Sequence, residues 1–264
     1  MLLVFKLLLT PLLIGLVSLV GRRWGPIVSG WLVGLPLTSG PVALFLALEQ
    51  GTAFASHAAQ GTLLGLISVG GFCLAYSWFS LRLDWLGSIL ASWGIFFALT
   101  ALLDLVSVSL VFAFAGVIAS LAIVLILLPG SQGSSVVTAP PSWETPLRML
   151  VATAFVVVLT AVAGLLGPRL SGLLTPFPLY ATILAVFTHH FQGSSAARQT
   201  LRGTVSGSFT FAVFFLLISV LLAKWGIVAS FSFATLAALI MHGGVLFLLK
   251  RSWPAPESPV GKGP

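Results

Sequence analysis

The sequence predicts an all-α polytopic membrane protein, with about nine transmembrane helices in two inverted-topology repeats of five and four helices. Composition, a series of long apolar runs and an internal repeat carry this prediction. Of the 264 residues, 58% are hydrophobic and 6% are charged, whereas soluble domains average about 25% charged residues. Twelve basic and five acidic side chains cannot cover a soluble fold of this length. The composition therefore excludes a soluble enzyme, a nucleic-acid binder and a disordered protein.

The transmembrane helices are predicted from apolar runs of about 20 residues, the length that spans a bilayer. The predicted spans are 2–20, 25–48, 61–79, 85–103, 106–128, 147–166, 168–190, 203–223 and 227–249. The first run continues into Arg22 and Arg23 without a small-residue cleavage site, so we expect a retained span rather than a signal peptide. We divide the chain into a first repeat (1–128, spans 1–5), a Pro/Ser/Gly-rich linker (129–146), a second repeat (147–250, spans 6–9) and a disordered tail (251–264).

The orientation follows from the basic residues of the connecting segments, which accumulate on the cytoplasmic side. Nine of them share one side: Arg22, Arg23, Arg82, Arg148, Arg198, Arg202, Lys250, Arg251 and Lys262. The other side carries Arg169 and Lys224, and Lys6 lies inside the first span. We therefore expect a multi-pass protein of the plasma (inner) membrane of a bacterium, with the N-terminus outside and the C-terminus in the cytoplasm.

An internal repeat is the most informative feature of the sequence. Residues 25–65 align without a gap with residues 167–207, and 15 of the 41 aligned positions are identical. The identities concentrate on Gly, Pro and Gln, as at Pro36 and Pro178, and such self-similarity marks a duplicated structural unit. Because the first unit has an odd number of spans, five, the second unit begins on the opposite side of the membrane. Inverted repeats of this kind are common among secondary transporters.

The aligned segments carry prolines at matching depths within their spans. Proline removes a backbone donor and clashes with the preceding helical turn, so both helices are predicted to break or kink. Breaks are tolerated in a membrane where they line a cavity, and matched breaks indicate a midplane binding site. The candidate substrate-binding residues are Pro36, Thr38, Ser39, Gly40, Pro178, Tyr180 and Thr182. The alternative is a pair of kinks that only improve helix packing.

Polar links follow the two broken spans. Candidate gating or proton-coupling groups are Glu49 and His57 on the outer side, and His189 and His190 on the inner side. The alternative is the ordinary polarity of residues at the level of the lipid headgroups. Adjacent histidines on a helix point about 100° apart and do not chelate together, so we expect no metal site.

No catalytic signature occurs in the chain: there is no nucleophile elbow, HExxH, paired Asp or P-loop. We therefore expect no enzyme activity and no cofactor. The expected partners are the lipid bilayer and a small solute of unknown identity, with no nucleic acid; a homo-oligomer is possible.

The segments GWLVGLPLTSGPVALFLALEQG (30–51) and GLLTPFPLYATILAVFTHHFQG (172–193) resemble a pattern in small uncharacterised bacterial inner-membrane proteins. They are similar to the GlpM-like family, which has a glycine-led helix with a central Phe-Pro or Leu-Pro and a polar-glycine end. The two segments make up about a sixth of the chain. It implies a fused duplication of such a unit and carries over no site residue.

Three classes of function fit these observations. The first is a secondary transporter or permease that moves a small solute by alternating access at a site between the broken spans. The second is a lipid-handling or envelope-assembly protein, in which inner basic residues meet anionic headgroups. The third is a non-transporting membrane scaffold, in which the breaks serve packing only.

Overall fold

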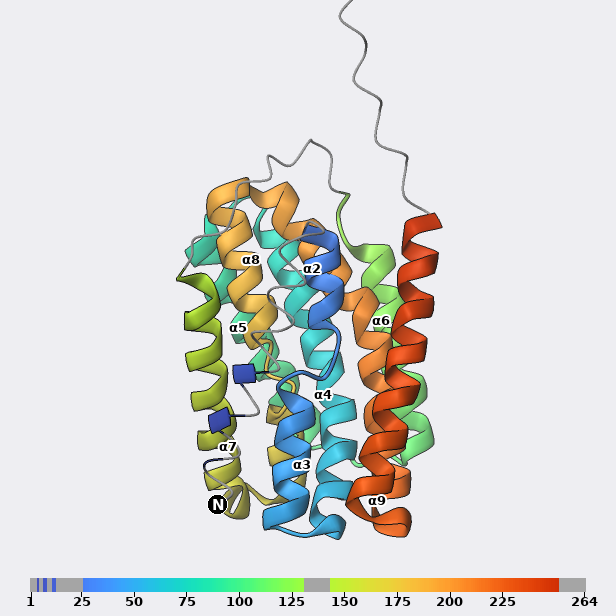
Figure 1. Cartoon of the computed structure of the whole chain (residues 1–264). Coiled ribbons are helices and arrows are strands. Elements are labelled where there is room, and N and C mark those ends of the chain that lie inside the picture. The colour runs from blue at the N-terminus through green and yellow to red at the C-terminus, as the bar shows by residue number, and fades with distance from the viewer. Residues whose placement is uncertain (1–3, 5–6, 9–10, 13–25, 131–142, 252–264) are drawn as a thin grey trace, which may run out of the picture.

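The computed structural model describes residues 4, 7–8, 11–12, 26–130 and 143–251 (Figure 1). Most of the first predicted span, most of the linker and nearly all of the tail lie outside these residues. The described residues form helices and no strand. The helices are α2 (Pro26–Val33), α3 (Ser39–Glu49), α4 (Thr52–Phe79), α5 (Trp85–Asp104), α6 (Leu110–Leu127), α7 (Glu144–Leu174), α8 (Leu179–Gln192) and α9 (Ser194–Arg251).

Five of the described helices, α4, α5, α6, α7 and α9, are long and apolar enough to cross a membrane. This agrees with the predicted membrane class. The outer helices present large apolar side chains at their surface, as a helix facing lipid does, since hydrocarbon replaces water there. Examples are Leu90, Phe97, Val111, Phe112 and Ile126.

The boundaries of the helices differ from the predicted spans at two polar links. Helix α4 begins at Thr52 rather than 61, and α9 begins at Ser194 rather than 203. A glycine precedes each helix with a positive φ, 89° at Gly51 and 87° at Gly193, which turns the chain sharply. The residues after each turn include several alanines, which favour helix. The polar links are therefore mostly helical.

Helices α4 and α9 form the centre of the bundle. Helix α4 packs against α5, α6, α7 and α9, and α9 also packs against α2, α6 and α8. Helix α7 bends at Gly167 and α9 bends at Gly226, each with a φ of 74°. The part of α9 that follows Gly226 is antiparallel to the part that precedes it (Figure 1).

The two interrupted segments run in opposite directions. From α2 through α3 the chain descends in Figure 1, and from the end of α7 through α8 it ascends. Contacts at both ends agree with this arrangement. The side chain of Gln50, just after α3, lies near Gly164 of α7, while His189 near the end of α8 contacts Tyr76 near the end of α4.

Contacts between the central helices recur at the sequence offset of 142 residues. A Cβ on Gly34 would lie 2.3 Å from the Cα of Gly207, so α2 and α9 touch through their backbones. The aligned contact is between Pro176 and Gly65, where a Cβ on Gly65 would lie 2.6 Å from the Pro176 ring. Helix α2 thus packs on α9 as the end of α7 packs on α4, which needs small residues at both places.

A polar contact recurs in the same way. Thr100 on α5 donates to Ser68 on α4 over 3.0 Å. The positions 142 residues later are His242 and Thr210, whose Nδ1 and Oγ1 atoms lie 3.2 Å apart. His242 also stacks on Trp31 of α2, with ring centroids 3.8 Å apart.

Candidate functional site

The candidate site lies where the two interrupted segments meet, which we call the crossing (residues 34–38 and 175–178). Helix α2 ends at Val33 and α3 begins at Ser39, while α7 ends at Leu174 and α8 begins at Leu179. Both gaps therefore fall where prolines had predicted a break. The residues in the gaps make only short local backbone hydrogen bonds, such as Leu37 N to Leu35 O at 2.7 Å.

One side-chain hydrogen bond joins the two gaps directly. The buried hydroxyl of Ser39, at the start of α3, donates to the carbonyl oxygen of Thr175 at the end of α7 over 3.0 Å. The hydroxyl of Thr175 in turn donates to the carbonyl of Ser171 one helical turn back, at 2.6 Å. The end of α7 is thus satisfied from both its own helix and the other interrupted segment.

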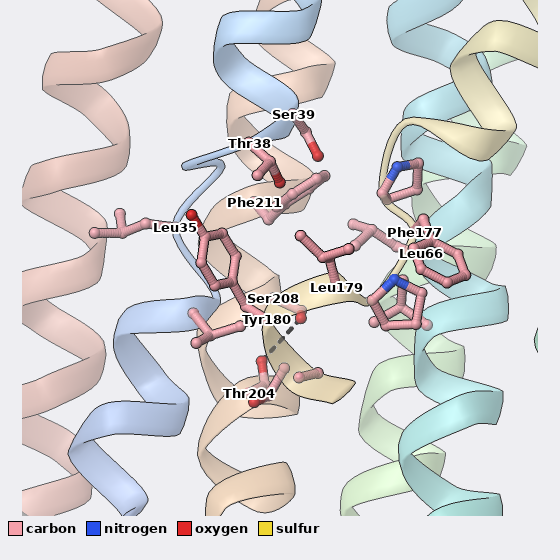
Figure 2. A pocket seen from close by; sticks show the side chains of 15 residues that line it. Leu35, Thr38, Ser39, Leu66, Phe177, Leu179, Tyr180, Thr204, Ser208 and Phe211 are labelled. Carbon is pink, nitrogen blue, oxygen red and sulfur yellow. Dashed lines mark hydrogen bonds between the residues drawn. The ribbon is translucent and has the colours of Figure 1, made fainter. Parts of the chain in front are cut away.

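A cavity of about 40 Å³ lies at the crossing, between both gaps and the central helices α4 and α9 (Figure 2). A site needs roughly 10–15 Å³ of such volume for one water molecule, so the cavity holds a few non-hydrogen atoms. Its hydroxyl-bearing residues are Thr38, Ser39, Tyr180, Thr204 and Ser208. The remaining walls are apolar: Val33, Leu35, Leu66, Val69, Pro176, Phe177, Pro178, Leu179, Ala181 and Phe211.

Four of the seven predicted substrate-binding residues line this cavity: Thr38, Ser39, Pro178 and Tyr180. The other three, Pro36, Gly40 and Thr182, are close in sequence but are not part of its lining. The hydroxyl of Thr182 accepts a hydrogen bond from the indole of Trp93 on α5 at 3.2 Å.

Helices α4 and α9 add lining residues that the proline pattern did not indicate. Thr204, Ser208 and Phe211 come from α9, and Leu66 and Val69 come from α4. Thr204 belongs to a Gly-Thr-x-x-Gly segment (203–207) that repeats residues 61–65 at the offset of 142. Gly207 in this segment packs closely on Gly34, and the hydroxyl-bearing residue Ser208, one turn after Thr204, also lines the cavity. The Ser208 hydroxyl donates to the carbonyl of Thr204 at 2.8 Å (Figure 2).

The candidate gating residues lie at opposite ends of the bundle. Glu49 and His57 are both exposed, at the end of α3 and near the start of α4. Near the end of α8, the Nδ1 atom of His189 lies 3.2 Å from the buried hydroxyl of Tyr76. His190 is exposed and lies edge-on to Trp85, with ring centroids 6.1 Å apart.

An ion pair connects the bend of α7 with the turn between α5 and α6. The Nε of Arg169 lies 3.4 Å from a carboxylate oxygen of Asp104. The same guanidinium donates to the Ser107 hydroxyl at 3.2 Å, to the Leu103 carbonyl at 2.9 Å and to the Val106 carbonyl. Both charged side chains are about 40% exposed, 39% for Arg169 and 40% for Asp104, so solvent weakens their attraction.

Comparison of the chain with protein-family models, with curated proteins and with solved structures found no match. The resemblance to the GlpM-like family stays a prediction.

Proposed function

We propose that this chain is a secondary transporter that moves a small solute across the plasma membrane by alternating access. The observation that carries the proposal is the cavity between the two helix gaps, lined by the hydroxyl-bearing residues Thr38, Ser39, Tyr180, Thr204 and Ser208. Broken helices that cross near the middle of a bundle are a recurrent construction of transporter binding sites.

We further propose that residues 1–128 and 147–250 are inverted repeats. The antiparallel course of the two interrupted segments supports this arrangement. So do the glycine contacts and the Ser68–Thr100 and Thr210–His242 pairs, which recur at the offset of 142 residues. In such a pair of repeats, each interrupted segment packs on the central helix of the other repeat. A rocking motion at these contacts would open the crossing to one side and then to the other.

The charges of the described residues support the proposed orientation. Arg202, at the start of α9, donates to the carbonyl of Leu125 near the end of α6, and the indole of Trp78 at the end of α4 donates to the carbonyl of Leu127. These ends share one face of the bundle, which would be cytoplasmic. Arg169 lies at the opposite end, beside the turn between α5 and α6, which would be outside. In this proposal His189 and His190 belong to the inner gate and Glu49 and His57 to the outer one.

Lipid handling is less well supported than transport of a small solute. A cavity of about 40 Å³ holds a few non-hydrogen atoms and is much smaller than a phospholipid headgroup. A scaffold without transport activity would have the same close glycine packing, so an experiment must separate it from a transporter.

Labelling of a cysteine in the cavity distinguishes a transporter from a scaffold. The chain has one cysteine, Cys73, which is buried with 0% exposure. A Cys73→Ala variant therefore gives a clean background for Thr38→Cys in oriented liposomes. A transporter predicts that an impermeant thiol reagent reaches Thr38→Cys from both sides, with each side favoured under different solute conditions. Labelling from neither side would support a scaffold. The native chain, whose one cysteine is the buried Cys73, is a separate control that is expected to stay unlabelled.

A flux assay completes the test. Purified protein in liposomes is expected to move at least one small solute saturably, and the double variant Pro36→Ala and Pro178→Ala is expected to reduce that flux. Unchanged flux in the double variant would remove the crossing from the transport path.

A further inference from the structure

The backbone carbonyl and amide groups at the helix ends of the crossing differ in how many of them have hydrogen-bond partners. Before each gap, at the C-terminal ends of α2 and α7, six carbonyl groups accept hydrogen bonds from the protein itself: those of Trp31, Leu32, Ser171, Gly172, Leu174 and Thr175. The carbonyl groups of Val33 and Leu173 accept no backbone hydrogen bond within the described residues. The six occupied carbonyl groups attract a cation less than free ones would.

The N-terminal sides of α3 and α8 keep unused donors. Within the described part of the chain, the amides of Ser39 and Ala181 donate to no backbone carbonyl, although Gly40 and Thr182 beside them do. Ser39 and Ala181 are aligned at the offset of 142 residues, and both line the cavity. Two antiparallel helices of 11 and 14 residues thus begin at one small space, and the N-terminus of each carries a partial positive charge.

The side chain of Thr38 gives a second, independent indication of a ligand. Thr38 precedes α3 and is 7% exposed. A threonine at this position normally caps the helix with its hydroxyl, but Thr38 makes no such bond. Its Oγ1 has no hydrogen-bond partner among the described residues, and it lies at the cavity (Figure 2). A hydroxyl that lies at a cavity without a protein partner is satisfied when a water molecule or a ligand occupies the cavity.

The charges near the cavity favour one class of ligand. The described acidic side chains at the bundle ends are Glu49, Asp84 and Asp104, and none lines the cavity. A cation at the crossing would therefore have no carboxylate partner. An anion would meet two helix N-termini and the Thr38 hydroxyl, and half-helix N-termini are used in this way for anionic substrates.

We propose that the crossing binds a small planar monovalent anion of the size of nitrate or formate, held by the amides of Ser39 and Ala181 and by the hydroxyl of Thr38. This inference rests on the proposed transport function and specifies its substrate class. The cavity volume of about 40 Å³ limits the ligand to roughly three or four non-hydrogen atoms.

The test measures current and uptake in liposomes that contain the full chain. Sodium gluconate outside is exchanged for sodium nitrate, sodium formate or sodium chloride, and the sign of the current distinguishes anion entry from cation entry. Exchange of choline gluconate for sodium gluconate tests Na⁺, and light scattering tests urea and formamide, which are neutral and of similar size. We expect saturable anion currents for nitrate or formate.

The Thr38 hydroxyl is tested by variants. Thr38→Val removes the hydroxyl at nearly constant volume and is expected to raise the KM for the anion about tenfold, as expected for loss of one hydrogen bond to a charged group. Thr38→Ser keeps the hydroxyl and is expected to stay near the native KM. Thr62→Val is the matched control, because Thr62 is buried on α4 and its hydroxyl bonds only within its helix, to Ala58 at 2.9 Å. Stabilisation of the purified protein against heat by nitrate or formate, lost in Thr38→Val, supports binding without any transport assay.

The outcomes separate the two proposals. Uptake of urea or Na⁺ without an anion current overturns the anion assignment and leaves the transporter proposal standing. An anion current with an unchanged KM in Thr38→Val overturns the assigned binding group. No flux of any solute, with Thr38→Cys labelled from neither side, overturns both proposals.

Discussion

The hydroxyl of Ser39 donates a 3.0 Å hydrogen bond to the carbonyl oxygen of Thr175, across 136 positions of sequence. Ser39 begins α3 and Thr175 follows the end of α7, so this bond connects the two interrupted segments at the place where both have lost their regular helical pairing. In an apolar bundle, a carbonyl group without a hydrogen bond destabilises the folded state. The bond therefore stabilises the arrangement observed here.

Ser39→Ala removes this bond and is expected to lower the free energy of unfolding by about 1 kcal/mol, the usual size of such bonds in membrane proteins. Thermal unfolding in detergent measures the change. Ser56→Ala is the matched control, because the buried hydroxyl of Ser56 donates to the Ser219 carbonyl at 2.7 Å, away from the cavity lining. We expect both variants to lose similar stability and only Ser39→Ala to change flux. Equal flux in the two variants would contradict a role of the crossing in transport.

The glycine contact between α2 and α9 predicts a strong steric effect. A Cβ on Gly34 would lie 2.3 Å from the Cα of Gly207, so Gly34→Ala must push two backbones apart. We expect a loss of about 2–3 kcal/mol, in the upper range for overpacked sites. Gly94→Ala on α5 is the control, because a Cβ there meets nothing within 4 Å, and it is expected to leave stability unchanged or slightly higher. Equal unfolding temperatures for the two variants would mean that α2 and α9 are not in backbone contact.

The backbone conformation at Gly51 and Gly193 alone predicts how substitutions at these turns change the stability. Both have a φ near 90° (89° and 87°), and a Cβ added at either glycine would meet no atom within 4 Å. Alanine at either position is expected to cost about 1–3 kcal/mol, because the backbone angles at Gly51 (φ 89°, ψ 164°) and Gly193 (φ 87°, ψ 169°) belong to a region that essentially only glycine adopts. Stability measurements should give similar losses for Gly51→Ala and Gly193→Ala. A loss at only one of them would argue against equivalent turns in the two halves.

Substitutions of Arg169 and of Asp104 are expected to lower the stability of the protein by different amounts. Asp104→Asn removes only an ion pair between half-exposed groups, which is worth about 0–1 kcal/mol. Arg169→Ala also removes the bonds to Ser107 and to two carbonyls, so its unfolding temperature is expected to fall further. A greater loss in Asp104→Asn than in Arg169→Ala would show that the carboxylate, rather than the carbonyl groups, holds this turn.

The sequence predicted the features that depend on local chemistry. Proline placed both gaps correctly, since the loss of a backbone donor acts within one turn. Contacts between distant segments could not be predicted in this way. Nothing beside Ser39 in the sequence indicates Thr175 as its partner, and the apolar residue Leu66 carries no signal that it lines a cavity.

The starts of α4 and α9 were also missed. Polar residues at Thr52 and Ser194 predict a link, but helix formation there depends on the preceding glycine turns and on packing against neighbouring helices. Tertiary contacts decided the conformation of these segments.

The most direct test of the central claim is a reversible cross-link at the crossing. The variant Ser39→Cys and Thr175→Cys, in the Cys73→Ala background, is oxidised in liposomes, and solute flux is measured before and after reduction. Ser68→Cys and Thr100→Cys form the control pair, because their hydroxyls lie 3.0 Å apart on α4 and α5, within one proposed repeat. We predict that the Ser39–Thr175 link stops flux, that reduction restores it, and that the control link leaves flux unchanged. A Ser39–Thr175 link that forms and leaves flux intact would contradict alternating access through the crossing.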